Sequence, residues 1–255
     1  MEAKDYWPNR QQWKEKNALQ MKNTVIAKLV DVSKYYGNGA ARVTALDRVN
    51  LSLCRGDIVV LVGLSGSGKS TLLHLLGCID KQDKGNIIID GIDTSSMSLE
   101  QLAPLRLNKI GFVFQSFNLI PVLTAYENVE LPLLFKGLEK KAISERVHEV
   151  LDEVGLQDRK KHYPREMSGG QQQRVAIARA LAGQPSIVLA DEPTANLDSK
   201  TGEGILDLLL NLNQQKKSTL VISSHDSVVL DRIKSVVHIL DGRVSVDTEH
   251  SPVQT

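Results

Sequence analysis

The segment GLSGSGKST, at Gly63–Thr71, constrains the fold of this chain more than any other feature. It fits the G-x-x-x-x-G-K-[ST] template, follows the apolar run DIVVLVG from Asp57 and precedes the helical pattern STLLHLLG. Glycine backbone can turn successive N–H groups toward one point, and a helix that starts there adds its own free N–H groups. The segment therefore predicts a strand, a phosphate-binding loop and a helix, in that order.

The residue types in this loop match the needs of a bound polyphosphate. Lys69 supplies a point charge for the β- and γ-phosphates, and Ser70 supplies a hydroxyl ligand for Mg²⁺. The alternative is a glycine-rich turn without a ligand, but the strand before the loop and the helix after it disfavour that interpretation. The residues expected to form the cradle are Gly63, Ser65, Gly66, Ser67, Gly68, Lys69, Ser70 and Thr71.

A second segment, MSGGQQQRVAIARAL from Met167, has the same physical character. Two adjacent glycines open an amphipathic helix, which again presents bare backbone N–H groups to an anion. One nucleotide needs only one phosphate cradle. The sequence therefore raises the question of which phosphate the second loop binds.

Two carboxylates, Asp191 and Glu192, end the apolar strand SIVLAD. Such a pair alone is more typical of a helix cap or a solvated loop. Beside a phosphate site, Asp191 suits the Mg²⁺ shell and Glu192 suits a general base, a role that contributes about 10²–10⁴ in rate. Gln115 ends the strand IGFVFQ, where its amide could touch Mg²⁺ and the attacking water, and His225 follows TLVISS. Each would be an ordinary polar residue alone, so the other motifs make both candidates.

Short β-branched runs alternate with helical patterns, which predicts a largely parallel sheet with flanking helices. The candidate strands start at Thr24, Val49, Asp57, Asn86, Ile110, Ser186, Ser218, Ser235 and Arg243. From Ser98 to about His162 the pattern becomes helical. The segment KKAISERVHEVLDEVG has one apolar helical face, formed by Ile143, Val147, Val150, Leu151 and Val154. We interpret residues 98–162 as a helical subdomain inserted into the sheet domain.

Composition narrows the class of protein. The 31 Lys and Arg nearly cancel the 30 Asp and Glu, so no overall field attracts nucleic acid, and we expect no nucleic-acid partner. No apolar run approaches the roughly 18 residues of a membrane helix, and the first residues lack the apolar stretch of a signal peptide. Cys54 and Cys78 lie in apolar surroundings without metal-ligand spacing, which is typical of core packing in a reducing compartment. We therefore expect a soluble cytoplasmic α/β protein.

Six ordered motifs resemble those of the nucleotide-binding subunits of ATP-binding-cassette transporters, from about Val25 to Val246. They are GLSGSGKS, Gln115, the SGGQ signature from Ser168, ADEP, the NLD loop ending at Asp198, and His225. The resemblance implies an α/β fold of the P-loop NTPase (RecA-like) type: a mixed sheet core, an inserted helical subdomain and an antiparallel β portion near the N-terminus. It also implies an aromatic platform for adenine, for which VSKYY offers Tyr36, with Tyr35 as the alternative.

The resemblance implies the site and its cofactors, ATP and Mg²⁺. In this family two domains meet head to tail, and each signature loop caps the ATP of the other, so a second copy of the chain is an expected partner. The signature loop, Ser168, Gly169, Gly170 and Gln171, would then serve a partner's nucleotide, with Ser168 and Gly170 on the γ-phosphate. Asp198 is a further implied nucleotide-binding residue. The implied catalytic residues are Glu192, His225, Gln115 and Lys69, and the implied metal ligands are Ser70, Gln115 and Asp191.

The expected domain organisation follows from the extent of the motifs. Residues 1–24 are polar and are predicted to be a flexible extension, and residues 248–255 are predicted to be a tail. The ATPase domain spans residues 25–247, with the helical insert at 98–162 and the signature loop at 167–171.

The segment QSFNLIPVLTAYENVELPLLF, from Gln115, is similar to lipoprotein-release, macrolide-export and antimicrobial-peptide-export ATPases. Those ATPases act with membrane permeases that carry large extracytoplasmic domains, and a periplasmic adaptor is a further expected partner. The resemblance places the chain on the cytoplasmic face of the inner membrane. Residues 119–123 are apolar enough to receive the membrane partner, although packing against the helical insert is an equal alternative.

The resemblance favours a motor enzyme: ATP closes the dimer, hydrolysis reopens it, and a membrane partner converts this into export or extraction. The rival interpretation is a regulatory subunit, as in cell-division relatives that control wall hydrolases without moving cargo. No residue in the chain decides between a motor and a regulatory subunit. A ribosome-binding factor would need two cassettes, and a DNA-repair ATPase would carry a long coiled coil, so both are disfavoured.

Overall fold

The computed structural model describes residues 24–246 and contains two sheets. The central sheet has six strands in the order β10-β9-β3-β8-β7-β6. Its strands are β3 (Ile58–Val62), β6 (Ile110–Val113), β7 (Ile187–Asp191), β8 (Thr219–Ser223), β9 (Ser235–Leu240) and β10 (Arg243–Val246). All neighbouring pairs are parallel except β9 and β10, which are antiparallel. This is the mixed sheet expected from the sequence.

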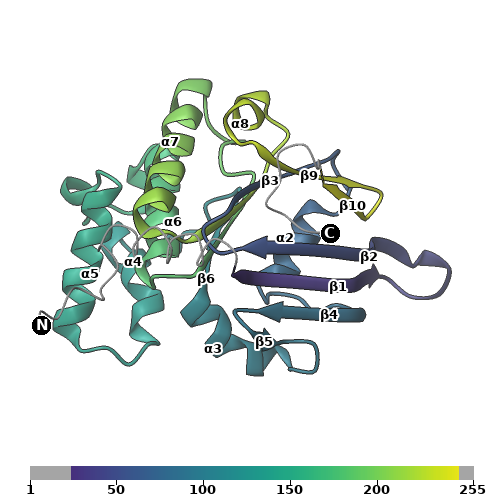
Figure 1. The fold of residues 1–255 in the computed structure, drawn as a ribbon. Coiled ribbons are helices and arrows are strands. Elements are labelled where there is room, and N and C mark those ends of the chain that lie inside the picture. Colours follow the sequence, from purple (N-terminus) through teal and green to yellow (C-terminus); the bar gives the residue numbers. More distant parts are fainter. Residues whose placement is uncertain (1–23, 247–255) are drawn as a thin grey trace, which may run out of the picture.

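The second sheet is antiparallel and has the order β2-β1-β4-β5. It contains β1 (Val25–Tyr36), β2 (Val43–Cys54), β4 (Lys84–Ile89) and β5 (Ile92–Asp93). Figure 1 shows β1, β2 and β4 extending to one side of the central sheet, opposite the helices α4 and α5. The expected antiparallel portion near the N-terminus is confirmed.

The helices lie between the strands along the chain. They are α2 (Lys69–Leu76), α3 (Leu99–Lys109), α4 (Ala125–Leu134), α5 (Lys140–Glu153), α6 (Gly169–Ala182), α7 (Ser199–Lys216) and α8 (Ser227–Arg232), with short 3-10 turns at Gly39–Ala41, Gln157–Arg159 and Pro164–Glu166. Within residues 24–246, no helix is long and apolar enough to cross a membrane.

All nine strands expected from the sequence are present, but their bounds differ. β1 continues to Tyr36 and β2 begins at Val43, because the two pair along most of their length with several register shifts. The two-residue strand β5 was not expected. Pairing between these two consecutive strands therefore lengthens elements that look short in the sequence.

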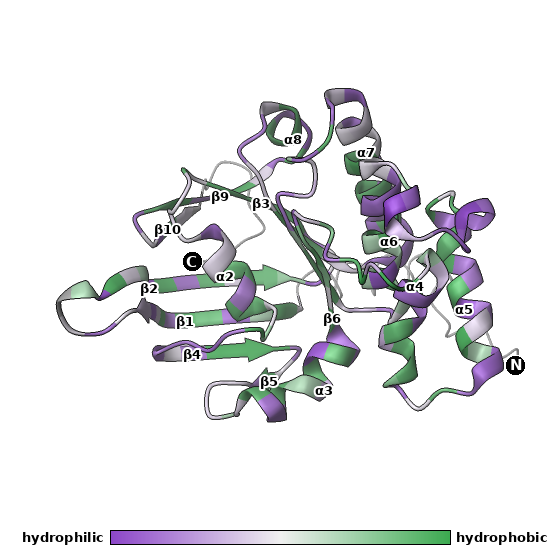
Figure 2. Cartoon of the chain, turned by 180° about the vertical axis from the view of Figure 1, so that it is seen from behind, coloured by the Kyte–Doolittle hydropathy of each residue, from purple (hydrophilic) through white to green (hydrophobic). Residues whose placement is uncertain are grey.

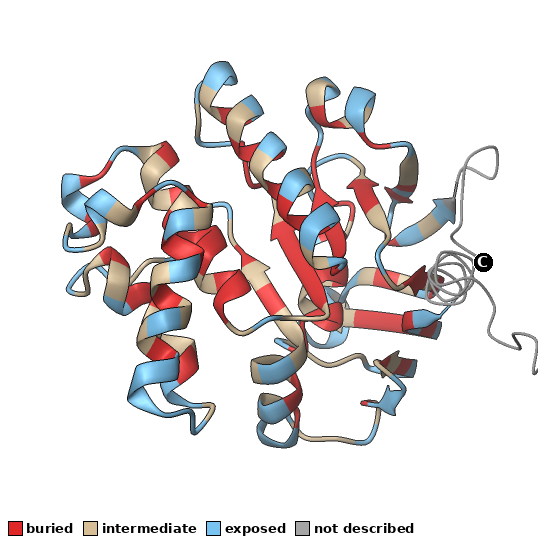
Figure 3. Cartoon of the chain, turned by 60° about the vertical axis from the view of Figure 1, so that its left-hand side comes forward, coloured by how far each residue is buried: buried red, intermediate tan, exposed pale blue. Residues whose placement is uncertain are grey.

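The central sheet separates two hydrophobic cores. Along β3, Val60 faces the core that contains the helices α5 and α6, whereas Val59 and Leu61 face the core shared with the antiparallel sheet. This alternation follows from the two-residue period of a strand that is covered on both faces. The central strands are accordingly buried in Figure 3 and hydrophobic in Figure 2.

The helical insert is narrower than the sequence predicts. The range 98–162 contains β6, which pairs in parallel with β7 and so belongs to the central sheet. The helices that pack together beside the sheet are α4, α5 and α6 (Figure 1). The apolar face expected on α5 is confirmed, because all five of its residues are buried.

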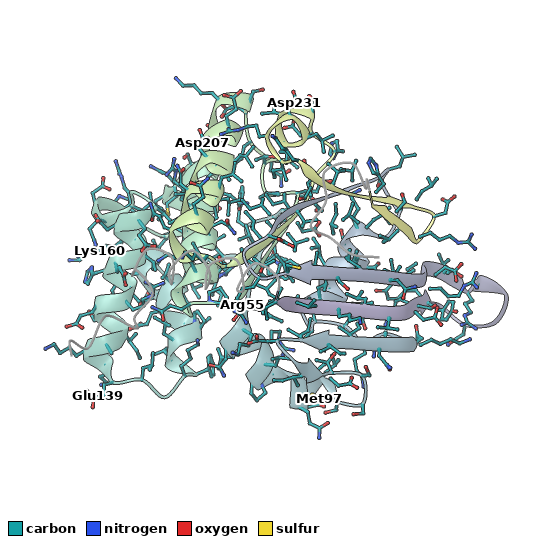
Figure 4. The ribbon with its side chains drawn as sticks, viewed as in Figure 1. Arg55, Met97, Glu139, Lys160, Asp207 and Asp231 are labelled. Atoms are coloured by element: carbon teal, nitrogen blue, oxygen red, sulfur yellow. The ribbon has the colours of Figure 1, made fainter. Side chains whose placement is uncertain are left out.

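An ion-pair cluster joins the antiparallel sheet to α3. Asp90 accepts from Arg55 Nη2 at 2.6 Å and pairs with Lys109 Nζ at 2.7 Å. Arg55 lies near the middle of the molecule, where it is labelled in Figure 4.

The predicted tail, residues 248–255, lies outside the described residues, as does the predicted extension except for Thr24.

Candidate active site

The loop between β3 and α2 has the backbone conformation that its glycines permit. Gly66 and Gly68 have φ angles of 80° and 111°, in a region that other residues rarely adopt. A Cβ on Gly68 would lie 2.6 Å from Ala45 O, so the loop also packs tightly against β2. The loop is therefore fixed in shape before any ligand binds.

The start of α2 presents unpaired donors at this loop. The first N–H groups of a helix have no partner inside it. Within residues 24–246, the N–H groups of Lys69, Ser70 and Thr71 donate no hydrogen bond to backbone outside the helix. The partial positive charge of a helix N-terminus adds to these free donors. Together they form a cradle suited to an anion.

Lys69 is buried, with 8% of its surface exposed, and has only neutral partners. Its Nζ donates to Gly63 O at 2.7 Å and to Leu64 O at 3.1 Å. No carboxylate of the described chain pairs with it. Because a buried charge without a counter-ion is costly, the loop favours an anionic ligand.

Ser67 differs from the rest of the predicted cradle. Its Oγ is buried and has no partner within the described residues, and its N–H donates to Leu64 O. It does not line the cavity in front of the loop, whereas Gly63, Ser65, Gly66, Gly68, Lys69, Ser70 and Thr71 do. Ser67 therefore shapes the loop from inside.

The end of β7 brings two carboxylates to the same edge of the sheet. Asp191 Oδ1 accepts from Ser223 Oγ at 2.5 Å, and the same oxygen of Ser223 accepts from Glu192 N at 2.9 Å. Glu192 has a φ angle of 46°, which is unusual for a residue with a side chain. Ser223 on the neighbouring strand β8 thus holds both residues, a role that the sequence did not reveal.

Glu192 and His225 form a pair beside the phosphate loop. Glu192 Oε1 lies 3.0 Å from His225 Nδ1, and both side chains line one cavity with Ser70 and Gln115. Glu192 is 14% exposed and His225 is 73% exposed. Asp191 does not line the cavity. A carboxylate so placed can accept a proton from water that enters from the loop side.

Tyr36 lines the same cavity, and Tyr35 does not. Tyr35 lies in a separate hollow, where the guanidinium of Arg42 stacks 3.7 Å from its ring centre. Neighbouring residues on a strand point to opposite faces, so only one of the two can face the loop. The structure places Tyr36 there.

The signature loop forms a helix cap. Ser168 is the N-cap of α6: its Oγ accepts from Gln171 N at 3.3 Å, and Gln171 Oε1 accepts from Ser168 N at 3.0 Å. Ser168 is exposed, whereas Gly170 is buried. None of Ser168, Gly169, Gly170 and Gln171 lines the cavity of the phosphate loop. The two anion-ready loops therefore do not share a site within one chain.

The NLD loop is tied to its neighbours. Asp198 is the N-cap of α7 and accepts from Thr201 N at 3.0 Å. Hydrogen bonds from the side chain and then the backbone of Thr201 lower the pKa of Asp198. Asn196 Nδ2 donates to Gln115 O at 3.0 Å. The NLD loop thus contacts the glutamine loop directly.

Two residues of α6 that the sequence analysis did not single out also hold the site. Gln173 is fully buried and its Nε2 donates to Pro193 O, next to Glu192, at 2.8 Å. Arg179 donates to Phe117 O and Asn118 O, just beyond Gln115, at 2.9 and 2.6 Å. The helix α6, which follows the signature loop, therefore hydrogen-bonds to the segment that carries Glu192 and to the segment that carries Gln115.

Gly170 leads to a stability prediction, because a Cβ there would overlap Thr201 Cγ2 on α7. We expect Gly170→Ala to lower the free energy of unfolding by about 1–3 kcal/mol, as overpacked sites do. Thr201→Ser removes the clashing methyl group and should restore most of that loss in the double variant. Denaturant unfolding measures both effects.

Gly204→Ala, on α7, is the matched control for Gly170→Ala, because its Cβ would meet nothing closer than Arg174 Nη2 at 3.9 Å. It should leave stability unchanged or raise it, since alanine favours helix. Equal destabilisation by both alanines would contradict the packing account.

Comparison with known proteins places these features in one family. The ABC transporter family matches residues 46–195. An uncharacterized ABC transporter ATP-binding protein of Thermotoga maritima is 52% identical over 219 residues, which cover 86% of this chain and 93% of the relative. The macrolide export ATP-binding/permease protein MacB of Mannheimia succiniciproducens is 41% identical over 90% of this chain, which spans 36% of that longer protein.

A solved structure agrees in fold. It is the dimeric, post-hydrolysis state of the ATP-binding cassette MJ0796 of Methanocaldococcus jannaschii, bound to ADP and Pi. It superimposes with a TM-score of 0.80 at 46% identity, over 87% of this chain and 97% of that one. These likenesses, together with the phosphate cradle and the carboxylates beside it, show that the chain belongs to the ABC transporter family as an ATP-binding, ATP-hydrolysing subunit.

Proposed function

We propose that two copies of this chain close head to tail around two ATP molecules and drive a separate membrane subunit in export or extraction. One observation carries the proposal: each chain holds one phosphate cradle and one further anion-ready loop outside that cradle's cavity. A second copy of the chain would supply the anion-ready loop that each cradle lacks. Ser168, Gly169, Gly170 and Gln171, with Asp198 nearby, would then cap the partner's ATP.

Within one chain, we assign Tyr36 to the adenine ring and the cradle from Gly63 to Thr71 to the phosphates. Lys69 neutralises charge on the β- and γ-phosphates. Glu192 accepts the proton of the attacking water, while His225, hydrogen-bonded to it, orients the carboxylate.

The chain also has oxygen donors of the kind that Mg²⁺ prefers. Ser70 and Gln115 line the cavity, and Asp191, whose carboxylate accepts from Ser223 Oγ, precedes the cavity-lining Glu192 in the chain. We propose that these three side chains hold the ion. Bound Mg²⁺ would supply charge neutralisation for the phosphates.

For the membrane partner we propose the surface of residues 119–123. Asn128 anchors this segment: its Nδ2 donates to Ile120 O and Leu123 O, and its Oδ1 accepts from Ile120 N. Leu119 packs against the core, as expected if the segment packs within its own chain, but Val122 is 75% exposed. A loop that is held by Asn128 and exposes a valine offers that side chain to an apolar segment of another protein.

The partner test uses Val122→Asp in the native host. We expect the tagged native chain to co-purify a permease with a large extracytoplasmic domain, and Val122→Asp to lose it while its own ATPase rate is unchanged. Leu240→Asp is the matched control, because Leu240 is 63% exposed on β9. It should retain the permease.

Retention of the permease by Val122→Asp would contradict the docking surface. Co-purification of a wall hydrolase with the permease, rather than an adaptor, would replace export by the regulatory alternative.

A further inference from the structure

The side chain of Tyr36 is held by a contact at its hydroxyl group. Tyr36 ends β1 and lines the nucleotide cavity with 42% of its surface exposed. Its Oη donates to Asp80 Oδ2 at 2.9 Å. The ring is thus open to a ligand while its far end is fixed.

Asp80 is itself held firmly. Its Oδ1 accepts from Lys34 Nζ at 2.7 Å and from Lys81 N at 2.7 Å. Burial raises the pKa of Asp80, but hydrogen bonds from Lys34, Lys81 and Tyr36 outweigh it and bring the pKa below its usual value. Asp80 is therefore ionised at neutral pH, and a charged acceptor makes the stronger hydrogen bond with the tyrosine.

Lys34 is the third member of the cluster that Tyr36 and Asp80 form. It is 9% exposed, its Nζ also donates to Lys81 O at 2.6 Å, and Nζ lies 5.1 Å from the centre of the Tyr36 ring. Cations within about 6 Å of a ring centre are attracted to it. One ammonium group therefore binds Asp80 and supports the ring that Asp80 holds.

The chain connects this cluster to the phosphate cradle through α2. The cradle lies at the N-terminus of α2, and Asp80 follows its C-terminus, where Asp80 N donates to His74 O at 3.3 Å. The eight residues of this helix span about 12 Å at 1.5 Å per residue. One rigid helix thus sets both the phosphate donors and the anchor of the ring.

We infer that Asp80, supported by Lys34, is a positioning residue for recognition of the nucleotide base. It fixes the Tyr36 ring in the orientation that receives the base, so that binding does not have to immobilise a mobile side chain. The inference rests on the proposed role of Tyr36 as the adenine platform. A purely structural ion pair between Lys34 and Asp80 would leave base-dependent affinity unchanged.

The test compares ATP with inorganic tripolyphosphate, which has the phosphates but no base. Tyr36→Phe keeps the ring and the Lys34–Asp80 pair and removes only the hydroxyl. We expect it to weaken ATP binding about threefold to tenfold in calorimetric titration with Mg²⁺, with tripolyphosphate changed less than about twofold. Asp80→Ala should have the same selective effect, and the double variant should be no weaker than the weaker single variant.

Two substitutions serve as matched controls. Tyr35→Phe removes the neighbouring hydroxyl outside the cavity, and Asp93→Asn alters a carboxylate that accepts its hydrogen bonds from Ser95 and does not line the cavity. Both should bind ATP as the native chain does. The melting temperature of each unliganded variant shows whether it is folded.

Native ATP affinity in Tyr36→Phe would overturn the inference, and so would equal weakening of ATP and tripolyphosphate. Tyr36→Ala separates this failure from failure of the platform itself. If Tyr36→Ala loses ATP affinity while Tyr36→Phe does not, the platform stands and Asp80 has no positioning role. If Tyr36→Ala binds ATP normally, both ideas are wrong.

Discussion

Glu192→Gln is expected to bind ATP with near-native affinity and to lose ATP turnover by about 10²–10⁴-fold, the usual contribution of a general base. Glutamine has the same size and can still hydrogen-bond His225, but it cannot accept a proton from water. The backbone of Glu192, held by Ser223, should not move. Steady-state phosphate release measures turnover, and calorimetric titration measures binding.

Lys69→Ala provides the contrasting loss. It removes the buried charge of the cradle, so binding itself should weaken rather than the chemical step alone.

Glu203→Gln is the matched control for Glu192→Gln, because Glu203 is an exposed carboxylate on α7 outside the nucleotide cavity. A Glu192→Gln protein that hydrolyses ATP at half the native rate would remove Glu192 from the mechanism.

The parts of the site that are local in sequence could be predicted well. The cradle depends on a strand, a glycine loop and a helix that follow one another, so its chemistry is written in one short segment. Gln115, Asp191 and His225 could be brought to one place because parallel strands present their carboxyl ends at one edge of a sheet. In the structure Gln115 and His225 lie just beyond β6 and β8, and Asp191 ends β7, which lies between those two strands.

The supporting contacts could not be predicted, because their partners are far apart in the chain. Gln173 lies 20 residues from Pro193, and Arg179 lies 61 residues from Asn118. Asp80 lies 44 residues from Tyr36. Glutamine, arginine and aspartate at these positions look like ordinary surface residues, and only the packing of α6 and α2 shows what they bind.

The bounds of the helical insert failed for a related reason. The four-residue strand β6 follows α3 directly and lies inside the range 98–162, between helices. Its apolar residues are recognisable as a strand, but only pairing with β7 assigns them to the central sheet. Membership of a sheet is a property of the partner strand, not of the local pattern.

Ser168→Arg is expected to abolish ATP-dependent pairing without touching the chain's own nucleotide cavity. Ser168 is exposed at the start of α6 and outside that cavity, so each mutant chain should still bind ATP. The bulk of arginine would block the approach of another chain's phosphate loop. Placed in the Glu192→Gln chain, which holds ATP without hydrolysing it, the substitution isolates the capping step from the chemistry.

The mass of Glu192→Gln in solution tests the central claim, that the signature loop caps the ATP of another copy. Light scattering coupled to gel filtration should give one chain, 28.1 kDa, without nucleotide and twice that mass with saturating ATP and Mg²⁺. The Glu192→Gln chain that also carries Ser168→Arg should remain at 28.1 kDa in both conditions. A Glu192→Gln protein that stays monomeric at saturating ATP, even with its membrane partner supplied, would contradict the account.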